Sequence, residues 1–98
     1  MKTILITGAS SGIGCALAKI YAENSHNLVL VARREEKLKD LKEELEKKHS
    51  ISVIIEVMDL SKKENLEILS LKYKNIDVLI NNAGLGQYGK FDSYNLET

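Results

Sequence analysis

The stretch Thr7-Gly8-Ala9-Ser10-Ser11-Gly12-Ile13-Gly14 connects a short apolar run to the first long amphipathic segment of the chain. The run before it, Thr3–Thr7, is rich in β-branched residues and is predicted to be a strand. The segment after it, Ile13–Asn24, has apolar residues at helical spacing and is predicted to be a helix. The residues expected on the buried face of this helix are Ile13, Leu17, Ile20 and Tyr21. Three glycines therefore lie in one tight connection between a strand and a helix.

The alternation of strand-like and helix-like segments continues along the chain. Three further apolar runs are predicted to be strands, namely Leu28–Ala32, Ser52–Met58 and Asp77–Asn81. Two further stretches are predicted to be helices, namely Glu35–His49 and Ser61–Lys74. The second of these opens with a capping-box pattern. Its expected apolar positions are Leu66, Leu69 and Tyr73, with Ile68 and Leu71 broadening the face. This order, with its short connections, predicts a parallel α/β sheet.

Composition excludes several classes of protein. The chain has 98 residues and a mass of 11.0 kDa, which is enough for one small domain at most. Fourteen basic and fourteen acidic residues leave no net charge, so we expect no nucleic-acid or membrane-surface partner. The single cysteine, Cys15, cannot form an internal disulfide, and the two histidines lack ligand partners at metal-binding spacing. A cytoplasmic protein without a bound metal is the expectation.

The topology that these elements favour places both glycine-containing segments at one edge of the sheet. Right-handed crossovers predict a doubly wound, Rossmann-type sheet with strand order 3-2-1-4. The crevice of such a sheet lies between strands one and four, at their carboxyl ends. Gly8–Gly14 and Asn81–Gly89 follow those two strands directly. We therefore expect the binding site at this edge.

The glycine-containing loop has the features of a phosphate-binding turn. Gly8 permits a tight exit from the strand, Gly12 lets the backbone approach a pyrophosphate, and Gly14 permits close packing of helix on strand. The helix N-terminus supplies free N–H groups, and Ser10 and Ser11 can add hydroxyl donors. A purely structural turn is the alternative. The strand before the loop and the helix after it favour dinucleotide binding.

Three motifs together resemble the short-chain dehydrogenase/reductase family over essentially all 98 residues. They are the Gly-x-x-x-Gly-x-Gly loop from Gly8 to Gly14, Asp59-Leu60, and Asn81-Asn82-Ala83-Gly84. The resemblance implies an oxidoreductase that transfers a hydride between a nicotinamide and a carbonyl or alcohol substrate. It implies that the loop holds the pyrophosphate and that Asp59 and Leu60 contact the adenine. The residues implied for the loop are Gly8, Ser10, Ser11, Gly12, Ile13 and Gly14, and those bracing the central strands and bordering the ribose are Asn81, Asn82, Ala83 and Gly84.

Charge at the end of the second strand favours NADP as the cofactor. At the place where an NAD site commonly has a carboxylate, the sequence reads Ala32-Arg33-Arg34. A guanidinium can pair with a 2′-phosphate and stack on the adenine, whereas ordinary surface cations are the alternative. Asp59 has an alternative too, as a helix cap. Since Ser61 and Glu64 are predicted to cap that helix, Asp59 is expected to be free for the adenine.

The catalytic half of the family pattern is not found in this sequence. The family uses a serine and a Tyr-x-x-x-Lys pair, and the residues four positions after the tyrosines are Ser25, Asp77, Asp92 and Thr98. We expect residues 1–98 to be the NADP-binding half of a longer, homo-oligomeric reductase, inactive by themselves, with much of one sheet face uncovered. The alternatives are a non-catalytic dinucleotide-binding or interaction module, and a sugar-nucleotide epimerase or dehydratase.

Overall fold

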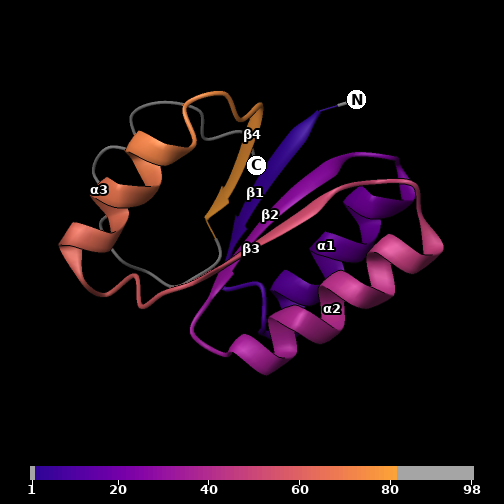
Figure 1. The fold of residues 1–98 in the computed structure, drawn as a ribbon, viewed down its shortest axis with the longest axis horizontal. Coiled ribbons are helices and arrows are strands. Elements are labelled where there is room, and N and C mark those ends of the chain that lie inside the picture. The colour runs from indigo at the N-terminus through magenta and orange to yellow at the C-terminus, as the bar shows by residue number, and fades with distance from the viewer. Residues whose placement is uncertain (1, 82–98) are drawn as a thin grey trace.

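The computed structural model describes residues 2–81 of the chain, and the predicted positions Asn82, Ala83 and Gly84 lie outside the described residues. The elements in chain order are β1 (Thr3–Thr7), α1 (Gly12–Glu23), β2 (Asn27–Ala32), α2 (Glu35–Lys48), β3 (Val53–Val57), α3 (Lys63–Lys72) and β4 (Val78–Asn81). The four strands are parallel and lie in the order β3-β2-β1-β4. Helices α1 and α2 cover one face of the sheet and α3 the other (Figure 1). The predicted doubly wound sheet is confirmed.

Successive side chains of each strand enter two different cores. On the side of α1 and α2, Ile4 and Ile6 of β1 pack with the leucines of α2. On the side of α3, Leu5 of β1 packs with Val29 and Val31 of β2. Because both faces are covered, the strands read as continuous apolar runs without polar alternation.

The face toward α3 is covered more completely than expected. Its strand residues Leu5, Val29, Val31 and Leu79 are each at most 1% exposed. They pack with Leu69 of α3 and also with side chains from the connections, which are Met58, Leu60 and Ile76. The expectation of a largely bare face is therefore wrong for these strands, because loop residues as well as the helix bury it. An exposed apolar side chain remains at the edge strand, where Ile54 is 45% exposed.

Helix α1 buries a different face from the one predicted. Ile13 and Ile20 are 68% and 52% exposed, while Leu17 and Tyr21 are partly packed on the core. The buried residues are Gly14, Ala18 and Ala22. Small side chains allow the helix backbone to approach β1 and β2 closely, which leaves no room for a large residue on that line. The small size of the side chains, more than their hydrophobicity, therefore determines which face of α1 packs on the sheet.

Helix α3 also starts differently from the prediction. Its N-cap position is Lys62, which makes no side-chain cap, and the helix begins at Lys63. The predicted capping box is wrong, because Ser61 Oγ donates to Asp59 Oδ1 at 2.7 Å instead. The main apolar positions predicted for this helix are confirmed, because Leu69 is fully buried and Leu66 and Tyr73 pack against the same core. Ile68 and Leu71, which were expected to broaden the face, are exposed. Helix α2 buries Leu38, Leu41 and Leu45.

Candidate functional site

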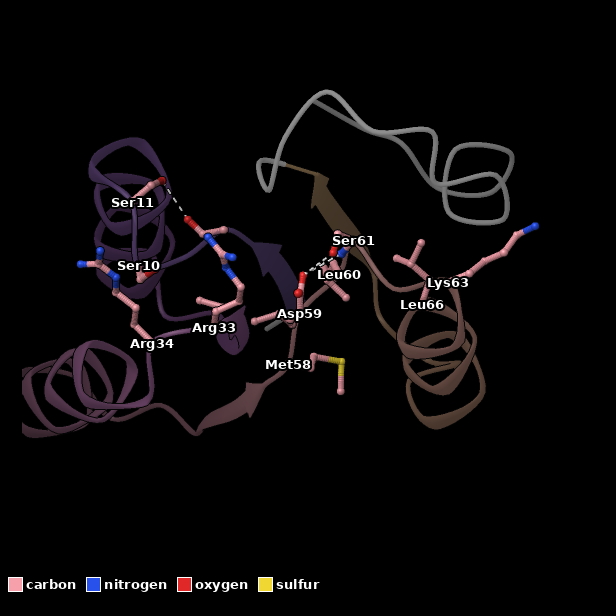
Figure 2. A pocket seen from close by; sticks show the side chains of 13 residues that line it. Ser10, Ser11, Arg33, Arg34, Met58, Asp59, Leu60, Ser61, Lys63 and Leu66 are labelled. Carbon is pink, nitrogen blue, oxygen red and sulfur yellow. Dashed lines mark hydrogen bonds between the residues drawn. The ribbon is translucent and has the colours of Figure 1, made fainter.

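A pocket of about 710 Å³ lies at the carboxyl ends of β1, β2 and β3. Three connections and the first turn of α3 form its walls (Figure 2). The lining residues are Gly8, Ser10, Ser11, Val31, Ala32, Arg33, Arg34, Met58, Asp59, Leu60, Ser61, Lys63 and Leu66. Seven of the predicted site residues are thus brought together, from segments more than twenty residues apart in sequence. They are Gly8, Ser10, Ser11, Arg33, Arg34, Asp59 and Leu60.

The loop after β1 is held in shape by its own backbone. Gly8 has a φ of 65°, in the left-handed region where a residue with a Cβ is strained. The N–H of Ala9 donates to the carbonyl of Val31 at 3.1 Å, which ties the loop to β2. The glycine at position 8 is therefore required by the tight turn, as predicted.

Ser11 caps α1 and closes the turn. Its Oγ accepts from the N–H of Gly14 at 3.1 Å and donates to the carbonyl of Gly8 at 2.8 Å. The hydroxyl proton of Ser11 thus serves the loop, which argues for a structural role beside the predicted role as a donor to a ligand. Helix geometry gives the N–H groups of Gly12 and Ile13 no acceptor within α1. These two groups carry the positive end of the helix dipole and can bind an anion.

Gly12 lies in open space at the start of α1. A Cβ built on it would meet nothing within 4 Å among the other atoms of the chain. Packing of the fold therefore does not require a glycine at this position. A backbone left bare beside free N–H groups fits a ligand that approaches closely, such as a pyrophosphate. Gly14, by contrast, is a buried residue on the face of α1 that packs on the sheet, where it allows the close packing predicted for it.

The charged side chains of the pocket are mainly positive. Arg33, Arg34 and Lys63 line it together with one carboxylate, Asp59. Arg33 points into the space between the loop after β1 and Asp59, whereas Arg34 points away from Asp59 (Figure 2). Both arginines are exposed. Excess positive charge near a helix N-terminus suits a ligand that carries more than one phosphate.

Asp59 orders the connection between β3 and α3. Its Oδ1 accepts from the backbone N–H of Ser61 at 3.0 Å and from the Ser61 hydroxyl. These two hydrogen bonds, together with the positive charge of Arg33, hold the pKa of Asp59 below its ordinary value. The carboxylate is therefore ionised at neutral pH. The expectation that Asp59 is free of a structural role is wrong, because its carboxylate accepts two hydrogen bonds from Ser61, the residue that was expected to cap the helix.

An apolar wall completes the pocket opposite the glycine-containing loop. Met58, Leu60 and Leu66 belong to the core on the α3 side and also line the pocket. Met58, Ser61, Lys63 and Leu66 were not predicted as site residues. Their signal in the sequence is position alone, since they flank Asp59 and begin α3. An apolar surface beside ionised groups can hold a flat aromatic ring.

Asn81 braces the centre of the sheet. Thr7 Oγ1 donates to the Ile80 carbonyl at 3.4 Å and lies 3.2 Å from Asn81 Oδ1, which joins the ends of β1 and β4. The residues that line the pocket do not include Gly12, Ile13, Gly14 or Asn81. The bracing role implied for Asn81 agrees with these contacts.

A parallel sheet in this order, with a glycine-containing loop and a pocket at the carboxyl ends of its strands, defines the Rossmann-type class of α/β proteins. Within that class the chain belongs to the short-chain dehydrogenase family, whose model, described as "short chain dehydrogenase", matches residues 2–98. The chain is 45% identical over 89 residues to an NADP-dependent 3-hydroxy acid dehydrogenase of Schizosaccharomyces pombe. It is 40% identical over 95 residues to an 11-beta-hydroxysteroid dehydrogenase of Pinus massoniana.

Solved structures agree with the sequence relatives. A short-chain dehydrogenase from Sphingobium yanoikuyae in complex with NADPH superposes with a TM-score of 0.81 at 39% identity, covering 89% of this chain and 35% of that one. The L-sorbose reductase of Gluconobacter frateurii, complexed with NADPH and L-sorbose, gives 0.75 at 34% identity, covering 88% and 34%.

The chain is shorter than the relatives it matches. The alignment with the Schizosaccharomyces enzyme covers 86% of this chain and 34% of the relative, and that with the Pinus enzyme covers 93% and 27%. The chain thus spans about a third of their length or less. Within residues 2–81, no helix is long and apolar enough to cross a bilayer. The same part of the chain has no cluster of three or more metal-ligating side chains.

Proposed function

We propose that this chain is the NADP-binding half of a short-chain dehydrogenase/reductase domain that transfers a hydride between the nicotinamide and a carbonyl or alcohol carbon. The observation that carries the proposal is the pocket in which the glycine-containing loop, Arg33 and Asp59 meet. Loop and helix N-terminus suit a pyrophosphate, and the guanidinium suits a 2′-phosphate. The cofactor, when bound, supplies the hydride chemistry.

Each part of the pocket, and the residues beside it, would have a partner in that ligand. The N–H groups of Gly12 and Ile13 would bind the pyrophosphate, with Ser10 at the loop. Arg33, supported by Arg34, would bind the 2′-phosphate. The adenine would lie against Met58 and Leu60, with its amino group toward Asp59. Asn81, together with Asn82, Ala83 and Gly84, would border the ribose.

Support for NADP also comes from the relatives. The Schizosaccharomyces relative is NADP-dependent, and the Sphingobium structure contains NADPH. A small-molecule substrate, a cytoplasmic location and a homo-oligomeric full-length enzyme are parts of the same proposal. Because no tyrosine of the chain is followed by lysine four positions later, the 98 residues should bind NADPH without oxidising it.

Binding of NADPH and NADH to the chain tests the proposal. Nicotinamide fluorescence should report binding of both, with NADPH bound more tightly. Gly12→Ala should weaken both, because its Cβ occupies the space of the pyrophosphate, while urea unfolding stays unchanged. Glu23→Ala, at the other end of α1, is the control. A wild-type chain that binds neither nucleotide, or a Gly12→Ala chain that binds both as well as wild type, would contradict the assignment.

A non-catalytic binding module would use the same pocket. Measuring turnover distinguishes it from a reductase. A protein that carries this chain and oxidises NADPH in the presence of a carbonyl compound is a reductase. One that binds NADPH with the same preference, yet oxidises none with any carbonyl compound, is a binding module.

A further inference from the structure

Helix α3 is joined to the sheet in a different way from the other two helices. The backbones of α1 and α2 approach the strands closely, whereas within residues 2–81 α3 has almost no such approach. Leu69 is the single fully buried residue among the ten of α3. The position of this helix therefore depends on a small number of side-chain contacts.

Three polar side chains fasten the carboxyl end of α3 to the edge strand. Glu56 of β3 has a side chain that is only 13% exposed, and its Oε2 accepts from Lys72 Nζ at 2.8 Å. The same oxygen accepts from the hydroxyl of Tyr73. The ammonium of Lys72 also lies 5.7 Å from the centre of the Tyr73 ring. We call Glu56, Lys72 and Tyr73 the α3 clamp.

The α3 clamp holds a charge that burial alone would disfavour. Burial raises the pKa of Glu56, but the hydrogen bonds from Lys72 and Tyr73 outweigh it and leave the pKa below its ordinary value. The carboxylate is therefore ionised at neutral pH, where it attracts Lys72. Hydrogen bonds to an ionised acceptor are stronger than those between neutral groups, and the two that Glu56 accepts restrict the side chains of Lys72 and Tyr73.

The α3 clamp is continuous with the apolar wall of the pocket. The ring of Tyr73 packs in the same core cluster as Met58, Leu60 and Leu66, and these three side chains line the pocket. Met58 lies two residues after Glu56, and strand alternation directs both toward α3. With ten residues, α3 is about 15 Å long, so its first turn lies at the pocket and its last turn lies at Glu56.

We propose that Glu56 is a positioning residue for the adenine side of the pocket, because it fixes the carboxyl end of α3 and thereby the wall formed by Met58, Leu60 and Leu66. The role rests on the proposed function. Glu56 touches no ligand itself. Loss of the α3 clamp lets the helix shift or tilt on the sheet, and the wall then fits the adenine less well.

Titrations of NADPH and 5′-AMP on the full chain test this role. Glu56→Gln and Tyr73→Phe should each weaken both ligands by the same factor, about three- to ten-fold. The matched control is Glu44→Gln on α2, which breaks ion pairs of Glu44 with Lys19 and Lys48 far from the pocket walls. Control binding should equal that of the wild-type chain. Amide hydrogen exchange in α3 beyond its first turn should accelerate in the two clamp variants and not in the control.

The dissociation constant separates positioning from mere stabilisation. Substitution of a purely structural residue lowers the free energy of unfolding yet leaves the affinity of the folded molecules for the ligand unchanged. Since Tyr73→Phe removes one hydroxyl, it retains a measurable folded population even if Glu56→Gln unfolds. Wild-type affinity in folded clamp variants overturns the role of Glu56 and leaves the proposed function intact. Failure of the wild-type chain to bind either ligand overturns both.

Discussion

Arg33→Ala is the substitution that most directly separates NADP from NAD recognition. Arg33 is exposed and points into the pocket beside Asp59, and it is one of three cationic side chains there against one carboxylate. A charge-assisted hydrogen bond to a phosphate contributes about 1.5–3 kcal/mol. Because this pocket is open to solvent, about 2 kcal/mol is the expected loss for NADPH, which is a factor of about 30 in dissociation constant.

NADH lacks the 2′-phosphate, so it should lose only the stacking of the guanidinium on adenine. That contact contributes about 0.5–1 kcal/mol at an exposed site, or a factor of about two to five. The ratio of NADPH to NADH affinity should therefore fall by about ten-fold. Added salt should narrow the difference between wild type and variant, because exposed charges are screened.

Fluorescence titrations of both nucleotides, at low and at high salt, measure this ratio. Arg34→Ala should change the ratio less, since its side chain points away from Asp59. Lys37→Ala, an exposed cation in the first turn of α2 outside the pocket lining, should leave it unchanged. Equal losses for NADPH and NADH in Arg33→Ala, or an equal effect of Lys37→Ala, would refute the assignment of the 2′-phosphate to Arg33.

Three further predictions concern stability. Gly8→Ala should lower the free energy of unfolding by about 1–2 kcal/mol, because φ is 65° at this position, and urea unfolding measures it. Leu69→Ala should cost about 2–5 kcal/mol, because the side chain is fully buried and its loss leaves a cavity beneath α3; a loss below about 1 kcal/mol would mean that α3 is not held by this contact. The lowered pKa of Glu56 means that its stabilising effect is complete above the ordinary value of 4.5 and is lost as pH falls through the lowered value. Wild type should therefore lose more stability than Glu56→Gln between pH 6 and pH 3 in unfolding titrations, and parallel curves would contradict this reasoning.

The strands and their order could be predicted because the information is local. A run such as Ile4-Leu5-Ile6 is apolar on both sides, which indicates a strand covered on both faces. The handedness of crossovers then limits the order to few arrangements. The position of the glycine-containing loop at the end of β1 follows from the same pattern.

The buried face of α1 could not be predicted from hydrophobicity, whereas the main apolar positions predicted for α3 do pack on the core. Ile13 and Ile20 were expected inside, but the close approach of α1 to the sheet admits only Gly14, Ala18 and Ala22. How near a helix lies to a sheet depends on all the residues between them, and a helical pattern does not contain that distance.

The hydrogen-bonding roles of Asp59 and Ser61 also became apparent only from the tertiary structure. The sequence contains two candidates for the cap of α3, Asp59 and Ser61, and both residue types are preferred at caps. In the fold the N-cap position is Lys62, and the carboxylate of Asp59 orders the turn before the helix by accepting from Ser61.

Residue types along the chain encode the sheet, the glycine-containing loop and the two arginines, since each depends on neighbours within a few positions. The apolar wall of the pocket and the α3 clamp depend instead on contacts between distant residues. The clamp brings Glu56 of β3 against Lys72 of α3 and against Tyr73 just after it, sixteen and seventeen residues later. Such contacts exist only when the helix is packed on the sheet, because that packing puts the first turn of α3 at the pocket and its last turn at Glu56.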